Sequence, residues 1–186
     1  MILQGMSDKE IVQERLQEKQ RMINAGRYMT KLFIVASSLI FITLLIVWVL
    51  QSLPELVVPQ IYEVGTWFIL VSSALLVLGQ LKIREDEIEK AFRFTGLGLF
   101  FGLLFSVLQV IGWQEMIDSN LFFRNILFPF SLIHFIHIAV GLVLLISVFR
   151  KIREYRVHSK SRQYAYNVFM FWHFLGGIWL IFIFLG

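Results

Sequence analysis

Five stretches of the sequence contain no Asp, Glu, Lys or Arg, and each is long enough to cross a membrane. A helix needs about 20 predominantly apolar residues to span the hydrocarbon core. A segment in lipid must also satisfy its backbone hydrogen bonds internally, so each stretch is predicted to be an α-helix. The predicted spans cover approximately residues 32–53, 64–81, 94–114, 125–149 and 163–186. The predicted fold class is therefore all-α, a polytopic bundle of five transmembrane helices.

The composition excludes several other classes of protein. Hydrophobic residues make up 58% of the 186 residues, charged residues only 16%, and the mean hydropathy is +0.73. A soluble domain carries about 25% charged residues, so a soluble enzyme and a disordered tail are both excluded. The sequence has no cysteine, which rules out a disulfide scaffold, a thiolate metal site and a cysteine nucleophile. The net charge of +4 comes from the segments outside the predicted spans, so no nucleic-acid partner is expected.

The distribution of the 17 Lys and Arg residues predicts the orientation in the membrane. Residues 1–31 hold six, the loop between spans two and three holds four, and the loop between spans four and five holds six. The loop between spans three and four holds only Arg124, and the remaining segments hold none. Because Lys and Arg are kept on the cytoplasmic side, the N-terminus is predicted to be cytoplasmic and the C-terminus periplasmic.

The N-terminal thirty residues are predicted to form a polar cytoplasmic helix ahead of the membrane domain, residues 31–186. The sequence Ser7-Asp8-Lys9-Glu10 has the spacing of a capping box, and the helix is expected to run to about Gly26. The segment is too charged for a cleaved signal peptide, so the first span is expected to be retained as an anchor. The polar helix is either a docking arm for a partner or a solvated surface, and its mixed charges favour the second.

Polar and small residues within the last three spans fall on single helical faces. In the third span they lie four, four, three and four residues apart, and in the fourth they lie four, three and four apart. Such stripes face the interior of a bundle and allow close helix packing. The residues of interest are Gly98, Gly102, Ser106, Gln109, Trp113 and the adjacent Glu115; Phe130, His134, His137 and Gly141; and Trp172, His173, Gly176, Gly177 and Trp179.

The three intramembrane histidines have two interpretations. A haem held by two histidines would need His173 opposite His134 or His137, and all three lie near mid-membrane. Hydrogen bonds across helices are the commoner use of such residues, and they are the favoured interpretation here. A carboxylate-bridged metal centre is excluded, because no Asp or Glu lies within any span.

Four motifs in the sequence resemble those of the cytochrome c oxidase subunit III family. They occur in the same order and on the corresponding helices, and the resemblance covers approximately residues 30–186. The motifs are the Ser-rich segment from Thr66 to Leu78; Leu108-Gln109 followed by Trp113 and Glu115; the segment from His134 to Gly141 (HFIHIAVG); and the segment from Phe171 to Leu180 (FWHFLGGIWL).

The resemblance is to the short, five-helix form found in bacterial heme-copper oxidases. It implies an accessory chain of the bacterial inner membrane that binds neither haem nor copper, next to a catalytic subunit I that binds both and to subunit II. It also implies bound phospholipid, and roles in stabilising the oxidase and in proton uptake. Helix packing or a lipid cleft is then the expected use of Gln109, Trp113, Glu115, His134, His137, Gly141, Trp172, His173 and Trp179.

The sequence departs from the family pattern at three places that bear on proton uptake. Ser37-Ser38 replaces a serine and a glutamate, Gly176 replaces an aspartate, and Gln80-Leu81 replaces a histidine pair. The acidic run of Glu85, Asp86, Glu87 and Glu89 could still gather protons at the inner surface, although a solvated loop is the favoured interpretation. Two alternatives stay open: a stand-alone haem- or quinone-binding electron carrier, and a subunit III-like partner of a nitric oxide reductase.

Overall fold

The computed structural model describes residues 8–50, 58–118, 127–157 and 161–185. These residues form five α-helices and no strand, as the uncharged stretches predicted. The helices are α1 (Asp8–Leu50), α2 (Gln60–Arg84), α3 (Ile88–Asp118), α4 (Leu127–Arg153) and α5 (Gln163–Leu185). All five are long and apolar enough to cross a membrane. The first seven residues and the predicted span ends at residues 51–53, 125–126 and 186 lie outside the described residues.

Helix α1 differs from the prediction of a separate polar helix that ends near Gly26. The structure has one continuous helix of 43 residues, which at 1.5 Å per residue is about 65 Å long. This is roughly twice the 30 Å thickness of the hydrocarbon core, so the polar first half extends beyond it. No proline interrupts the segment, and a single glycine costs a helix only about 1 kcal/mol, so Gly26 does not end it.

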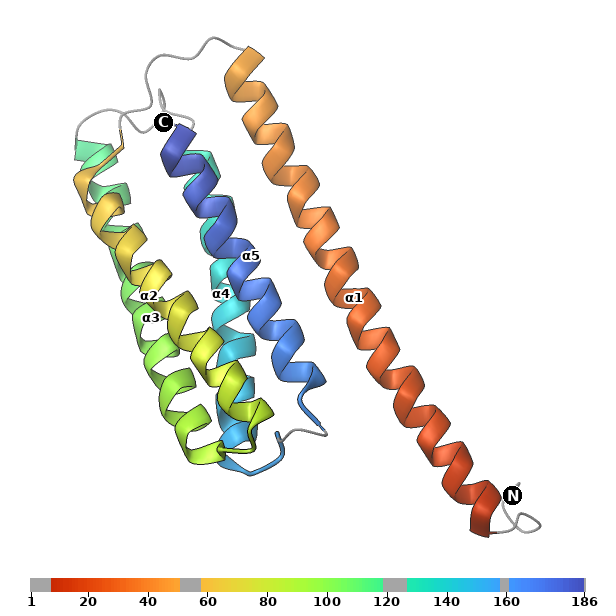
Figure 1. The fold of residues 1–186 in the computed structure, drawn as a ribbon. Coiled ribbons are helices and arrows are strands. Elements are labelled where there is room, and N and C mark those ends of the chain that lie inside the picture. Colours follow the sequence, from red (N-terminus) through yellow and green to blue (C-terminus); the bar gives the residue numbers. More distant parts are fainter. Residues whose placement is uncertain (1–7, 51–57, 119–126, 158–160, 186) are drawn as a thin grey trace.

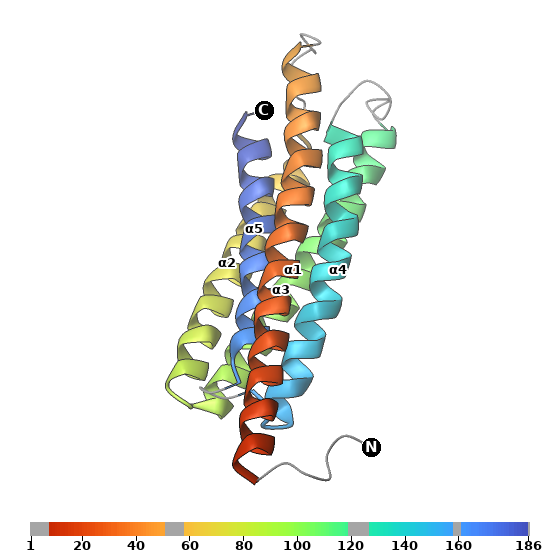
Figure 2. The same cartoon turned by 90° about the vertical axis from the view of Figure 1, so that its right-hand side faces the viewer.

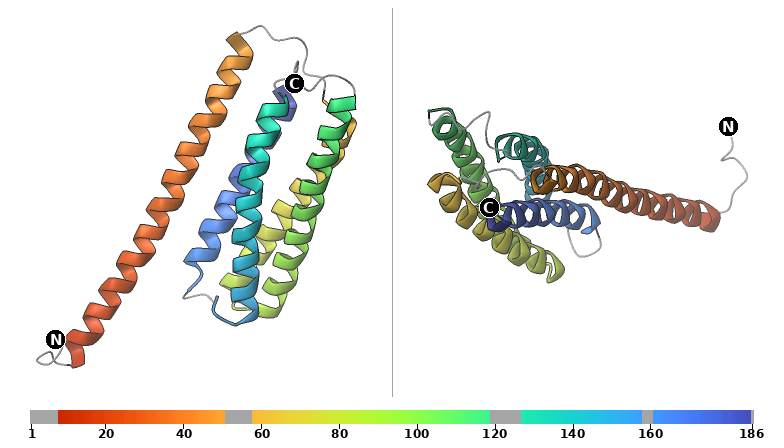
Figure 3. Two further views of the ribbon diagram at one scale, coloured as in Figure 1. Left: turned by 180° about the vertical axis from the view of Figure 1, so that it is seen from behind. Right: turned by 90° about the horizontal axis from the view of Figure 1, so that it is seen from above.

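Helices α2 to α5 pack side by side, whereas α1 leans against them (Figures 1 and 2). The first half of α1 diverges from the other helices, as the view from above shows (Figure 3). Only 11% of the apolar window of α1 is buried, compared with 28 to 44% in the other four helices. The chain therefore consists of a four-helix bundle with a fifth, peripheral helix that contacts α5 and, through Phe33 and Phe41, α4.

The predicted stripe on α3 faces the bundle interior and sets how closely the helices approach. Gly98, Gly102, Ser106 and Gln109 are all buried, and Trp113 is partly buried. A Cβ atom at Gly102 would lie 2.6 Å from the ring of Trp172 on α5, which is too close for any carbon–carbon contact. The absence of a side chain at Gly102 therefore allows the indole of α5 to lie directly against the backbone of α3.

The two ends of the bundle differ in charge. The start of α1, the α2–α3 turn, the end of α4 and the start of α5 lie at one end, and the end of α5 lies at the other (Figure 1). Every described Lys and Arg lies in the segments at the first end, which we call the basic end. Arg124 and Lys160 are outside the described residues. The loops rich in Lys and Arg therefore lie together at one end of the bundle, and the described segments without Lys and Arg lie at the other.

Candidate functional site

All five helices meet at one buried group of rings, which we call the aromatic cluster. It consists of Phe41 from α1, Phe105 from α3, Phe130 and His134 from α4, and Trp179 from α5, while Tyr62 brings α2 against its edge. His134 stacks on Trp179 with 5.3 Å between ring centroids, and Phe105 meets Trp179 edge-on at 5.3 Å. Offset-stacked and edge-on pairs of this kind stabilise a core beyond their buried area.

His134 is completely enclosed by this cluster. Its exposed fraction is 0%, and Phe130 stacks almost parallel to it at 6.0 Å while Phe41 meets it edge-on at 6.0 Å. Neither ring nitrogen has a hydrogen-bond partner among the described residues. The predicted cross-helix hydrogen bond is therefore wrong for His134: its neighbours are aromatic rings. A porphyrin has no space beside this imidazole unless the surrounding rings move.

The other two histidines lie outside the most deeply buried layer. His137 Nδ1 is 2.8 Å from the carbonyl oxygen of Ile133 on its own helix, and its ring contacts Phe33 and Phe41 of α1. His173 is partly buried, and its Nε2 has no hydrogen-bond partner among the described residues. His134 and His137 therefore contact other helices through aromatic rings.

Two tryptophans form hydrogen bonds across helices in this region. Trp179 Nε1 donates to Thr66 Oγ1 of α2 at 3.0 Å, and Trp113 Nε1 donates to Ser131 Oγ of α4 at 2.9 Å. Gln109, on the same face of α3 as Trp113, has an exposed fraction of 1% and no side-chain partner among the described residues. The sequence singled out both tryptophans but identified neither partner, because spacing along one helix does not reveal which residue faces it.

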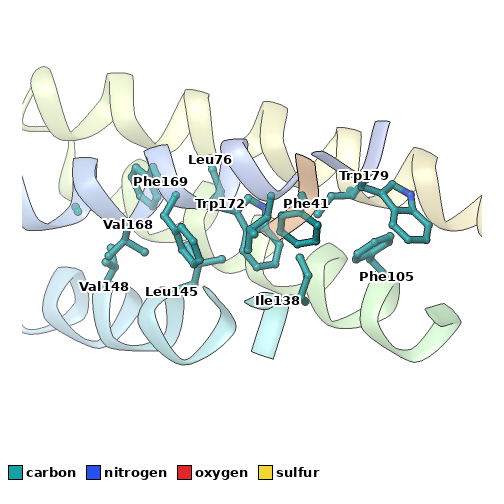
Figure 4. Close-up of a cluster of buried hydrophobic side chains, with 14 of the residues drawn as sticks. Phe41, Leu76, Phe105, Ile138, Leu145, Val148, Val168, Phe169, Trp172 and Trp179 are labelled. Atoms are coloured by element: carbon teal, nitrogen blue, oxygen red, sulfur yellow. The ribbon is translucent and has the colours of Figure 1, made fainter. Parts of the chain in front are cut away.

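Trp172 occupies a second buried position on α5, about two helical turns nearer the basic end than Trp179 (Figure 4). Its indole lies between two glycines: a Cβ at Gly102 of α3 would be 2.6 Å away, and one at Gly141 of α4 would be 3.1 Å away. These glycines were predicted to allow close packing, and the side chain they accommodate is Trp172. Gln109, His134, Gly141, Trp172 and Trp179 are thus inside the bundle, where lipid does not reach.

Two glutamates of the acidic run at the α2–α3 turn are paired with lysines. Lys82 Nζ lies 2.6 Å from Glu85 Oε2, and Lys90 Nζ lies 2.7 Å from Glu87 Oε2. The hydrogen bond from Lys90 holds the pKa of the Glu87 carboxyl below its ordinary value. Asp86 lies at the turn in the left-handed region, with φ of 56°. A group that gathers protons needs a pKa near the working pH, so the pairing makes Glu87 less suited to that role.

The remaining predicted site residues do not join one site. Glu115 is exposed on α3, near the end opposite the basic one, and Glu89 is exposed in the first turn of α3. Within the described ranges, no three His, Cys, Asp or Glu side chains gather closely enough to hold a metal ion. Ser37 and Gly176 are two of the positions at which the sequence departs from the family pattern. Ser37 is buried, and a Cβ atom at Gly176 would lie 3.4 Å from Ser73 Oγ of α2.

The fold and the aromatic cluster together place the chain in the class of polytopic helical membrane proteins. Its five helices meet at the aromatic cluster. Two proteins of known name are similar to the chain. Over 121 residues, 62% of this chain and 58% of the relative, the chain is 29% identical to cytochrome bo(3) ubiquinol oxidase subunit 3 of Buchnera aphidicola. Over 167 residues, 81% of this chain and 70% of the relative, it is 25% identical to cytochrome c oxidase subunit 3 of Synechocystis sp..

Both relatives are named as subunit 3 of an oxidase, so the comparisons confirm the subunit III resemblance that the four motifs predicted. The match spans less than two thirds of the length of the first relative. No protein-family model matches the chain. One relative belongs to a ubiquinol oxidase and the other to a cytochrome c oxidase, so similarity to this family does not indicate which electron donor is used.

Proposed function

We propose that the chain is the accessory third subunit of a heme-copper terminal oxidase in a bacterial inner membrane. The observation that carries this proposal is the similarity to two oxidase subunits, over 62% and 81% of the chain. The five membrane-spanning helices and the buried positions of the family motifs support it. The motif residues His134, Trp172 and Trp179 act by packing the helices together, and no chemistry is assigned to them.

In this proposal the haem and copper belong to the catalytic subunit I, which this chain flanks together with subunit II. The enclosure of His134 by aromatic rings on α1, α4 and α5 favours this function over a stand-alone haem carrier. Phospholipid binds at the periphery of the bundle, since the candidate residues of the interior are closed to it. Any contribution to proton uptake is small, because Glu85 and Glu87 are paired with Lys82 and Lys90.

Purification from native membranes tests the function directly. An affinity tag on this chain should recover a complex that shows haem absorbance and contains a second, histidine-rich membrane chain, identified by mass spectrometry. The isolated chain, separated from its partners, should show no haem absorbance. Haem that stays with the isolated chain would contradict the proposal and favour the electron-carrier alternative.

We also propose that the basic end faces the cytoplasm, which places the end of α5 on the periplasmic side. A reporter fused after Gly186 should therefore behave as periplasmic, and one inserted near Arg156 should behave as cytoplasmic. Alkaline phosphatase and a fluorescent protein, which are active on opposite sides of the membrane, give complementary signals at each position. The reverse pattern would invert the bundle, and equal signals at both positions would contradict the count of five spans.

A further inference from the structure

A cavity of about 420 Å³ opens at the basic end, between the first two turns of α3 and the last turn of α4. These two segments lie side by side (Figure 3). Phe92 of α3, which lines the cavity, stacks on Phe149 of α4, with 4.4 Å between the ring centroids. This contact packs α3 against α4 beside the cavity. The volume falls within the range of about 300–1,000 Å³ that small-molecule sites occupy.

The walls of the cavity combine an apolar floor with unpaired charges. Phe92 and Ile152 form the floor, and Arg93 of α3 and Arg153 of α4 line opposite walls together with Glu89. Within the described part of the chain, Arg93, Arg153 and Glu89 have no ion-pair partner. Glu89 and Arg93 are one turn apart on α3, a spacing that permits a salt bridge, yet none forms. Their charges remain available to a ligand.

Tyr155 completes the wall in an unusual backbone conformation. It follows α4 with φ of 55°, the left-handed region that a helix C-terminus normally assigns to glycine. Hydrogen bonds from the backbone N–H of Tyr155 to Ile152 O and from that of Arg156 to Lys151 O close the helix end. A bulky residue in this conformation is costly, and Tyr155 is 67% exposed, so core packing does not explain its presence. It does line the cavity.

We propose that this cavity binds the headgroup of a zwitterionic phospholipid. Guanidinium groups bind phosphate through charge-assisted hydrogen bonds, so Arg93 and Arg153 would hold the phosphodiester. The Glu89 carboxylate would accept hydrogen bonds from the ammonium group and would repel headgroups that carry a second negative charge. Phe92 and Ile152 would contact the glycerol and the start of the acyl chains. This site rests on the membrane placement in the proposed function, and does not depend on the oxidase assignment.

The charges favour a phospholipid over a free phosphate. Inorganic phosphate carries more than one negative charge near neutral pH, which Glu89 disfavours, and it has no apolar part for the floor. The cavity also lies where α3 begins and α4 ends, which in a membrane is the level of the lipid headgroups. A membrane phospholipid is present there at high local concentration, whereas a soluble anion must come from bulk water.

Native mass spectrometry of the full chain in neutral detergent tests the proposal. The chain is titrated with phosphatidylethanolamine, phosphatidylglycerol and diacylglycerol of matched acyl chains, and separately with inorganic phosphate. Phosphatidylethanolamine should be retained best and diacylglycerol least. The double substitution Arg93→Gln, Arg153→Gln should lower its affinity about tenfold or more, because two charge-assisted contacts are lost. Arg84→Gln, at the same end but outside this cavity, is the matched control and should change nothing.

Two further variants separate binding from folding. Glu89→Gln should shift the preference toward phosphatidylglycerol, because the ammonium of phosphatidylethanolamine loses its charged acceptor, whereas the uncharged glycerol of phosphatidylglycerol loses no such contact. Tyr155→Gly should keep or raise thermal stability while it lowers lipid retention, a combination that a purely structural role would not produce. Equal retention of diacylglycerol and phosphatidylethanolamine, or an unchanged preference in Glu89→Gln, would overturn the proposal. Displacement of the lipid by inorganic phosphate would assign the cavity to a free anion instead.

Because the isolated chain is used, failure of this test leaves the oxidase assignment standing. Equally, failure of the co-purification test leaves the lipid site standing.

Discussion

Replacement of Trp179 by alanine is expected to destabilise the folded bundle by about 3–5 kcal/mol, the usual cost of removing a buried tryptophan. The indole is fully buried and contacts Tyr62, Phe105 and His134, which come from three other helices. In lipid, helices associate through packing rather than through the hydrophobic effect, so an unfilled cavity at their meeting point removes the main attraction. Unfolding of the purified chain in mixed micelles, followed by circular dichroism, measures the change in free energy.

Two variants control for this result. Trp67→Ala removes the same side chain from α2 at a position that is 71% exposed, and it should change the free energy of unfolding by less than about 1 kcal/mol. Trp179→Phe keeps a ring but loses the hydrogen bond to Thr66, so it should cost an intermediate amount. Equal effects of Trp179→Ala and Trp67→Ala would show that the bundle interior is not organised around the aromatic cluster.

The sequence predicted the helices and their buried faces because both follow from one-dimensional rules. Uncharged stretches of about 20 residues identify membrane helices whatever their neighbours are. The spacing of Gly98, Gly102 and Gln109 places them on one face, and all three are buried in the structure. The same reasoning placed His134 and Gly141 together on α4, and both are buried.

The contacts between helices could not be predicted, because spacing along a helix does not identify its partner. Thr66, which accepts the hydrogen bond from Trp179, lies 113 residues away in the sequence. Phe41 is one apolar residue among many in the first span, and only the fold shows that it reaches His134. His134 itself was expected to form a hydrogen bond, since polar groups in lipid usually do, but the structure surrounds it with rings instead.

Local charge chemistry was predicted only in part. The acidic run was recognised, but its pairing with Lys82 and Lys90 depends on how tightly the α2–α3 turn closes. The left-handed conformation of Tyr155 carries no signal in the sequence, because tyrosine is rarely found there. The N-terminal polar helix was predicted, whereas its continuity with the first span was not, since Gly26 was interpreted as its end.

The second large effect is expected in the oxidase complex, if the chain is its accessory subunit as proposed. Removal of the chain should leave the initial rate of oxygen reduction in place, because the catalytic haem and copper belong to the partner. Activity should then fall progressively during turnover, since lateral contacts from helices and lipid no longer keep the catalytic subunit ordered. Slower proton uptake should be the smaller defect, because Ser38 and Gly176 stand where the family has acidic groups.

Oxygen consumption by the stripped complex, recorded continuously against the intact complex, separates these effects. Adding back the purified chain should restore a linear time course, whereas adding back the Trp179→Ala variant should restore it poorly, because a loosened bundle presents no fixed surface to its partner. Immediate and complete loss of oxygen reduction with haem retained would contradict an accessory role. A linear, unchanged time course would show that the chain neighbours the catalytic subunit without supporting it.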